Sequence, residues 1–149
     1  MSIKQKIYTH FLKMLNTNIS ILQKSLVDLK ESSSNETKST AGDKYETALA
    51  MLQIEQSNAR EQLQVVLTQK NLLDKINPTL SSSIIMNGSL IRTNKGYFFI
   101  SIAMRKALID GMVVYALSPQ SPLGKKLMGL KIYNKVIVNN IEYYIESIE

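Results

Sequence analysis

The sequence predicts an α+β protein in which an N-terminal antiparallel coiled-coil hairpin is followed by a small antiparallel sheet domain with one short helix. Three observations predict this fold class. Apolar residues recur at helical spacing over two long segments, a polar segment separates those segments, and the period changes to two after Pro78. We therefore divide the chain into a hairpin domain, residues 1–77, and a globular domain, residues 78–149.

The first helix is predicted from an apolar seam that alternates steps of four and three, with no Pro or Gly to interrupt it. Its members are Tyr8, Leu12, Leu15, Ile19, Leu22, Leu26 and Leu29. The polar residues from Ser32 to Gly42 then predict a loop.

The second helix is predicted from a weaker seam, which contains two polar positions and one alanine. Its members are Tyr45, Leu49, Leu52, Gln56, Ala59, Leu63, Val66, Lys70 and Leu73. The pair Asn77-Pro78 predicts its end, because proline restricts the residue before it. Two such helices form an antiparallel hairpin whose arms would each extend about 45 Å, a length suited to reaching into another molecule.

The second half is rich in β-branched and aromatic residues, which predict strands. We expect these strands over residues 89–93, 97–102, 111–117, 132–138 and 141–148, with turns at residues 94–96 and at Asn139-Asn140. A short helix is expected between them, because Ser121 suits its N-cap, Pro122 its first position and Gly129 the position after its end.

Composition limits the chemistry. The absence of cysteine excludes disulfides and thiolate metal sites, and His10 is the only histidine. No apolar run reaches the length of about 20 residues that spans a bilayer, and no secretory signal is recognisable, so we expect a cytoplasmic protein. The net charge is +6, and Asp110 is the only acid between Pro78 and Ile141, which favours a polyanionic or acidic partner.

The segment SPQSPLGKKLMGLKIYNKVIV, followed by IEYYIESIE, resembles the C-terminal domain of the Gre transcript cleavage factors. The resemblance falls on Ser121, Pro122, Leu123, Gly124, Leu127, Gly129 and the strands that follow. It implies an FKBP-like domain that docks at the secondary channel of a bacterial-type RNA polymerase. The expected polymerase-binding residues are Ser121, Pro122, Leu123, Gly124, Lys125 and Lys126.

The same resemblance implies that acids at the hairpin tip are the functional groups. Asp43 follows a glycine, and Glu46 lies three positions later on the same helix face. By resemblance, both help to bind the second catalytic Mg²⁺ inside the polymerase, near the nascent RNA 3′ end. The chain itself would then be no enzyme and would need no cofactor of its own. From the residues alone, the favoured interpretation of Asp-x-x-Glu is a variant of the helix capping box, whose acids also complement the helix dipole.

Other residues near the tip are weaker candidates for a functional role. Glu36 is a possible third acid, and Lys38 and Lys44 could contact the RNA or polymerase acids. The residues from Thr47 to Met51 depart from the acidic and amide-rich tip that is usual in the family.

Three alternatives stay open at this point. The protein could be a regulator or inhibitor that occupies the polymerase channel without promoting cleavage. It could be a non-catalytic coiled-coil adaptor with another partner, or a prolyl isomerase, although fold does not carry function. We expect a monomer, because an intramolecular hairpin already satisfies the heptad seam.

Overall fold

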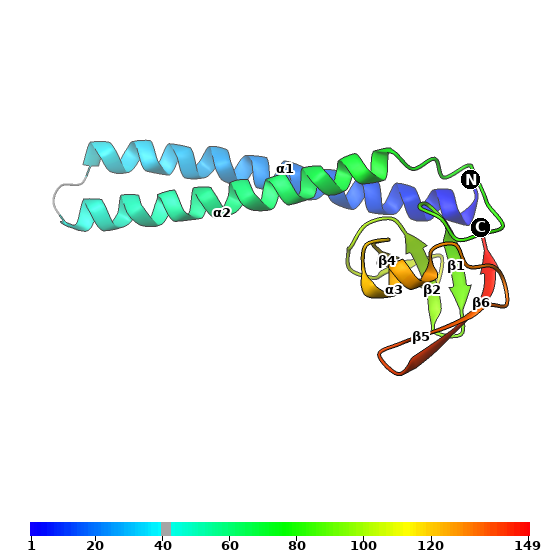
Figure 1. The fold of residues 1–149 in the computed structure, drawn as a ribbon. Helices are drawn as coiled ribbons and strands as arrows, with labels where there is room; N and C mark the ends of the chain where they lie inside the picture. The colour runs from blue at the N-terminus through cyan, green and yellow to red at the C-terminus, as the bar shows by residue number, and fades with distance from the viewer. Residues whose placement is uncertain (40–42) are drawn as a thin grey trace. The chain divides into compact units, whose positions relative to one another are not determined.

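The computed structural model describes residues 1–39 and 43–149, and the side chains outside residues 36–45. The predicted fold class is confirmed: a long helical hairpin is followed by a sheet with one short helix (Figure 1). The helices of the hairpin are α1 (Ile3–Ser39) and α2 (Asp43–Asp74).

The chain packs as two compact units. One consists of Lys13–Lys70, and the other combines Met1–Leu12 with Asn71–Glu149. The division of the chain at Asn77 follows secondary structure rather than packing, and it stays a prediction.

In the hairpin, the structure agrees with the predicted seams. Every seam residue whose side chain is described is buried or half-buried. The polar position Gln56 donates from Nε2 to the Leu29 carbonyl oxygen of the other helix at 3.2 Å, and its Oε1 accepts from Arg60 Nη2 at 3.1 Å. A polar residue in the seam therefore links the two helices and favours one register between them.

The helix α1 is longer than the sequence predicted. The segment from Ser32 to Gly42 was expected to be a loop, but α1 continues through Ser39, so that expectation is wrong for residues 32–39. Serine and asparagine have only modest helix propensities, yet extending an existing helix is much easier than nucleating one, and this segment contains no Pro or Gly before Gly42.

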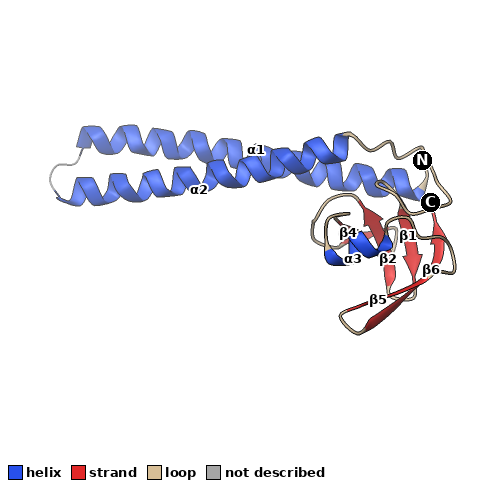
Figure 2. Ribbon diagram, viewed as in Figure 1, coloured by secondary structure: helices blue, strands red, loops and turns tan. Residues whose placement is uncertain are grey.

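Within the described residues, six strands form one sheet in the order β3-β4-β2-β1-β6-β5. Figure 2 shows strands of this sheet in red, with α3 beside them. They are β1 (Leu90–Thr93), β2 (Gly96–Ile100), β3 (Ala107–Ile109), β4 (Met112–Leu117), β5 (Lys135–Val138) and β6 (Ile141–Ile148), and the short helix is α3 (Pro122–Leu127). The expected turn at Asn139 and Asn140 joins β5 to β6, with φ values of 53° and 64°. Asparagine tolerates these angles better than most residues.

The sheet differs from the expectation at two points. Strand β3 was not predicted, and β2 pairs with β4 in parallel, whereas all other pairs are antiparallel. The register Phe98↔Tyr115 places two aromatic rings 5.4 Å apart in a stacked arrangement. Pairing between distant strands depends on this tertiary packing, which local periodicity does not encode.

Each face of the sheet has its own core. Phe99 stacks on Phe11 of α1 with ring centroids 6.3 Å apart, and Ile7 and Leu73 are also fully buried. Neighbouring residues of a strand point to opposite faces, so Phe98 and Ile100 face away from Phe99. They form the second core cluster with Ile85, Ile91, Leu127 and Ile145. Through Leu127, α3 is anchored in this second core.

Candidate functional site

The predicted tip acids lie at the start of α2. This helix begins at Asp43, but the side chain of Asp43 lies outside the described residues, as do those of Glu36, Lys38 and Lys44. Glu46 is exposed in the first turn of α2. Its carboxylate is therefore open to solvent, but the predicted pairing of Asp43 with Glu46 stays a prediction.

Ser121 is the N-cap of α3, as its sequence predicted. Its backbone is extended, and its Oγ accepts from the Gly124 N–H at 3.0 Å. The same hydroxyl donates to the Ser118 carbonyl oxygen at 2.7 Å. Pro122 then occupies the first helical turn, where its missing N–H has no helical partner to lose. Ser121 thus fixes both the start of the helix and the turn before it.

Gly124 is buried because the preceding turn folds against it. A Cβ at this position would overlap the Ser118 carbonyl oxygen and would lie 2.8 Å from Ser121 Oγ. The role of Gly124 is therefore close backbone packing, which holds the beginning of α3 against residues 118–121.

The end of α3 is tied to the segment before the sheet. Gly129 has a φ of 83°, and its N–H donates to the Ile85 carbonyl oxygen at 2.7 Å. The Ile85 N–H in turn donates to the Leu130 carbonyl oxygen at 2.8 Å. A left-handed backbone after a helix suits glycine, so this residue ends the helix and starts the return to the sheet.

These contacts separate the predicted polymerase-binding residues into two groups. Ser121, Gly124 and the half-buried Leu123 hold α3 in place, whereas Pro122, Lys125 and Lys126 are exposed on it. Lys126 Nζ lies 3.4 Å from the Ile137 carbonyl oxygen of β5. The structure thus presents a short basic helix of fixed position.

We expect Ser121→Ala to lower the free energy of unfolding by about 1 kcal/mol, because it removes the N-cap hydrogen bond. Urea unfolding followed by near-UV circular dichroism of the tyrosines would measure the change. Lys125→Ala, on the exposed side of the same helix, is the matched control and should change stability by less than about 0.5 kcal/mol. Equal stability of Ser121→Ala and wild type would contradict the capping role.

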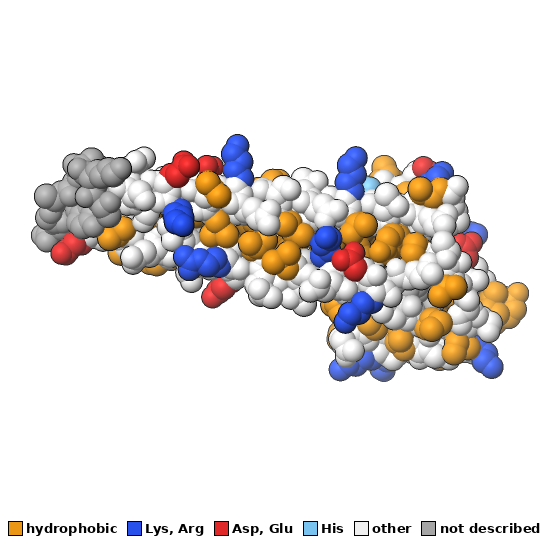
Figure 3. Space-filling model, turned by 90° about the horizontal axis from the view of Figure 1, so that it is seen from above, with side chains coloured by type: hydrophobic (Ala, Val, Ile, Leu, Met, Phe, Trp, Pro, Cys, Tyr) orange, Lys and Arg blue, Asp and Glu red, His pale blue; other side chains and the backbone are white. Residues whose placement is uncertain are grey.

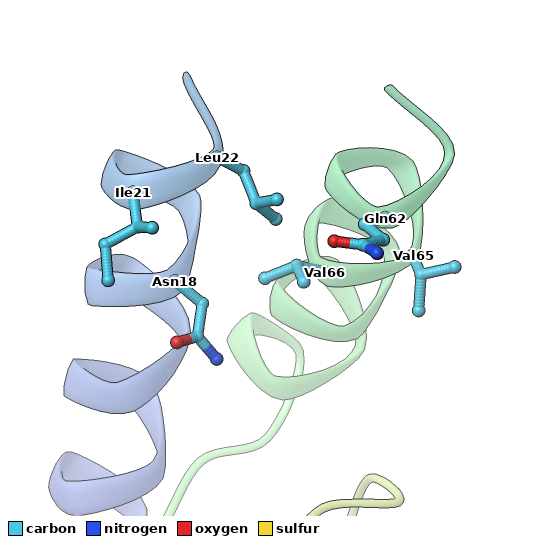
Figure 4. Close-up of a pocket in the computed structure, with 6 residues that line it drawn as sticks. All are labelled: Asn18, Ile21, Leu22, Gln62, Val65 and Val66. Atoms are coloured by element: carbon cyan, nitrogen blue, oxygen red, sulfur yellow. The ribbon is translucent and has the colours of Figure 1, made fainter. Parts of the chain in front are cut away.

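A groove of about 410 Å³ lies between the helices of the hairpin (Figure 4). Leu22 of α1 and Val66 of α2 point toward one another across it, and Ile21, Val65, Asn18 and Gln62 complete its lining. Ile21 and Val65 are 58% and 59% exposed. Figure 3 shows hydrophobic side chains exposed along one face of the hairpin.

This groove was not predicted from the sequence. Its signal was present in Ile21 and Val65, which are apolar although neither occupies a seam position. Exposed apolar residues grouped in this way mark a surface that another molecule can cover.

Among the described residues, no helix is long and apolar enough to cross a membrane, and no three His, Asp or Glu side chains are grouped as a metal site.

No protein-family model matches the chain, and no curated protein matches it. The solved structure of the transcription factor Gfh1 is similar over 92% of this chain and 92% of that chain, with 14% sequence identity and a TM-score of 0.36.

Proposed function

We propose that this protein is a transcription elongation factor that binds RNA polymerase in its secondary channel and stimulates the polymerase to cleave backtracked RNA. One observation carries the proposal. The segment that resembles the Gre factors folds into a capped helix with exposed Pro122, Lys125 and Lys126, in a chain that also contains a long helical hairpin.

The hairpin supports the proposal through its surface. Ile21, Val65 and Ile54 are each more than half exposed, and the groove between α1 and α2 is lined without any charged side chain. A hairpin that works inside a channel has protein on its sides, so exposed apolar groups would be covered in the complex.

The tip would provide carboxylates to the polymerase. Glu46 is exposed at the start of α2, and carboxylate oxygens are the ligands that Mg²⁺ prefers. Asp43 and Glu46 would hold the second Mg²⁺ together with polymerase ligands, near the RNA 3′ end. When bound, this ion supplies an activated water and neutralises charge on the phosphate. The protein would act as a monomer in the cytoplasm and would cleave no RNA without polymerase.

The test uses a backtracked elongation complex of bacterial RNA polymerase with Mg²⁺, with and without the full-length protein. Binding to polymerase and faster release of a 3′ RNA fragment are expected. RNA incubated with the protein alone should stay intact. Failure to bind polymerase would overturn the proposal and favour a coiled-coil adaptor with another partner.

A second candidate is a regulator that occupies the same channel without stimulating cleavage. The observation that favours it is the departure of residues 47–51 from the tip that is usual in Gre factors. Binding to polymerase with unchanged or slower cleavage would select this candidate.

A further inference from the structure

We propose that the segment joining α2 to the sheet forms, with the start of α1, a binding site for a small phosphate monoester. The site is a cavity of about 360 Å³ within the unit that contains the sheet. Its polar lining includes Lys4, Lys75, Asn77, Ser81, Ser82 and Asn87. This inference goes beyond the proposed function and does not depend on it.

The main evidence for a ligand is the buried ammonium group of Lys4. The residue is only 5% exposed, and within the described part of the chain its Nζ donates one hydrogen bond, to the Leu80 carbonyl oxygen at 2.6 Å. An ammonium group has three N–H donors, and burying its charge is costly unless that charge is compensated. Among the described residues, no acid forms an ion pair with Lys4. A bound anion would accept from the other N–H donors of this ammonium and would compensate its charge.

The protonation of Lys4 agrees with this geometry. Burial lowers the pKa of the Lys4 ammonium from its ordinary value, and the charge of Glu149 only partly opposes that effect. Burial lowers a lysine pKa because it removes water from the charged form. An anion in the cavity would raise the pKa of Lys4 again.

The rest of the lining determines the class of anion. Lys75 provides a second ammonium, and no carboxylate lines the cavity, so the site favours a dianion over a monoanion. Ser82 Oγ accepts from the Ile84 N–H at 3.2 Å, which leaves its hydroxyl hydrogen able to donate. Asn77 uses Oδ1 to accept from Thr79, which leaves its amide nitrogen able to donate.

The cavity also has an apolar wall formed by Ile76, Leu80 and Met86. Its volume lies within the usual range for small-molecule pockets, about 300–1,000 Å³. A phosphate attached to an organic group therefore fits this lining better than inorganic phosphate does.

The experiment titrates the full-length ¹⁵N-labelled protein with phenyl phosphate near pH 8, with ionic strength held constant by chloride. Saturable shifts of the Asn87 and Gly88 amide signals are expected, together with a rise in the Lys4 pKa. Inorganic phosphate should bind more weakly than phenyl phosphate. Dimethyl phosphate, a monoanion that represents a nucleic-acid backbone, should bind at least about tenfold more weakly.

The variants Lys4→Met and Lys75→Met should each lower the affinity for phenyl phosphate about tenfold, whereas Lys131→Met, an exposed control with the same charge change, should retain it. Because Lys75 is exposed, its variant tests the site even if Lys4→Met does not fold. Shifts that do not saturate, or wild-type affinity in Lys75→Met, would overturn the site. Equal binding of dimethyl phosphate would overturn the assignment to a monoester.

Discussion

Replacing both Asp43 and Glu46 by alanine is expected to lower polymerase-dependent RNA cleavage about 100-fold while binding to polymerase is retained. Under the proposed function, both carboxylates help to hold the second Mg²⁺, whose Lewis acidity is worth several kcal/mol in the transition state. A loss of about 2.7 kcal/mol corresponds to the expected 100-fold decrease. Single-turnover cleavage in a backtracked complex, at saturating protein, would measure it.

The controls separate metal binding from helix capping. Asparagine caps a helix about as well as aspartate does, so Asp43→Asn with Glu46→Gln keeps the cap and removes the charges. This variant should also lose cleavage. The double variant Glu55→Ala with Glu61→Ala removes two exposed acids elsewhere on α2 and should cleave like wild type. Full cleavage by the Asn/Gln variant would restrict Asp43 and Glu46 to a capping role.

Gly124→Ala is expected to lower the free energy of unfolding of the sheet unit by about 3 kcal/mol. The new Cβ would overlap the Ser118 carbonyl oxygen and would also approach Pro119 Cα to 3.0 Å. Both neighbours are backbone atoms, so relief requires movement of the turn or of α3, and such overpacking is among the larger effects of single substitutions.

Urea unfolding followed by near-UV circular dichroism would measure the stability of the Gly124→Ala variant. The chain has no tryptophan, and the rings of Tyr115 and Tyr143 contact Phe98 in the sheet. Polymerase binding should weaken in parallel, because the exposed residues of α3 would lose their fixed position. The control at the next residue, Lys125→Ala, should unfold like wild type to within about 0.5 kcal/mol. A loss below about 1 kcal/mol in Gly124→Ala would show that the turn adapts to the methyl group.

The parts of the fold that were predictable are those encoded by local chemistry. The heptad spacing from Tyr8 to Leu29 predicted residues of α1 that are half-buried or buried, but it missed Ile7 and Phe11, which are fully buried. Ser121 and Gly129 predicted both ends of α3. Strand β3 was not predictable in the same way, because three residues are too short to show a period. The parallel pairing of β2 with β4 depends on contacts between distant segments.

The candidate site around α3 was likewise predictable only where local chemistry determines it. Capping chemistry explained Ser121, but nothing in the sequence places the Ser118 carbonyl against Gly124. The cavity around Lys4 was missed for the same reason, because Lys4 and Leu80 meet only after folding. Seam residues are recognised by their spacing. Ile21 and Val65 lie outside the seams, so only their exposure in the structure identifies them as part of an apolar surface.

The grouping of Met1–Leu12 with Asn71–Glu149 has a consequence for biosynthesis. Ile7 and Phe11 leave the ribosome well before Phe99, against which Phe11 stacks. At about 5–20 residues per second, the delay between Phe11 and Phe99 is roughly 4 to 18 s. During this delay the apolar side chains of Ile7 and Phe11 lack the sheet against which they pack, and the sheet unit can be completed only after Ile145 of β6 has emerged.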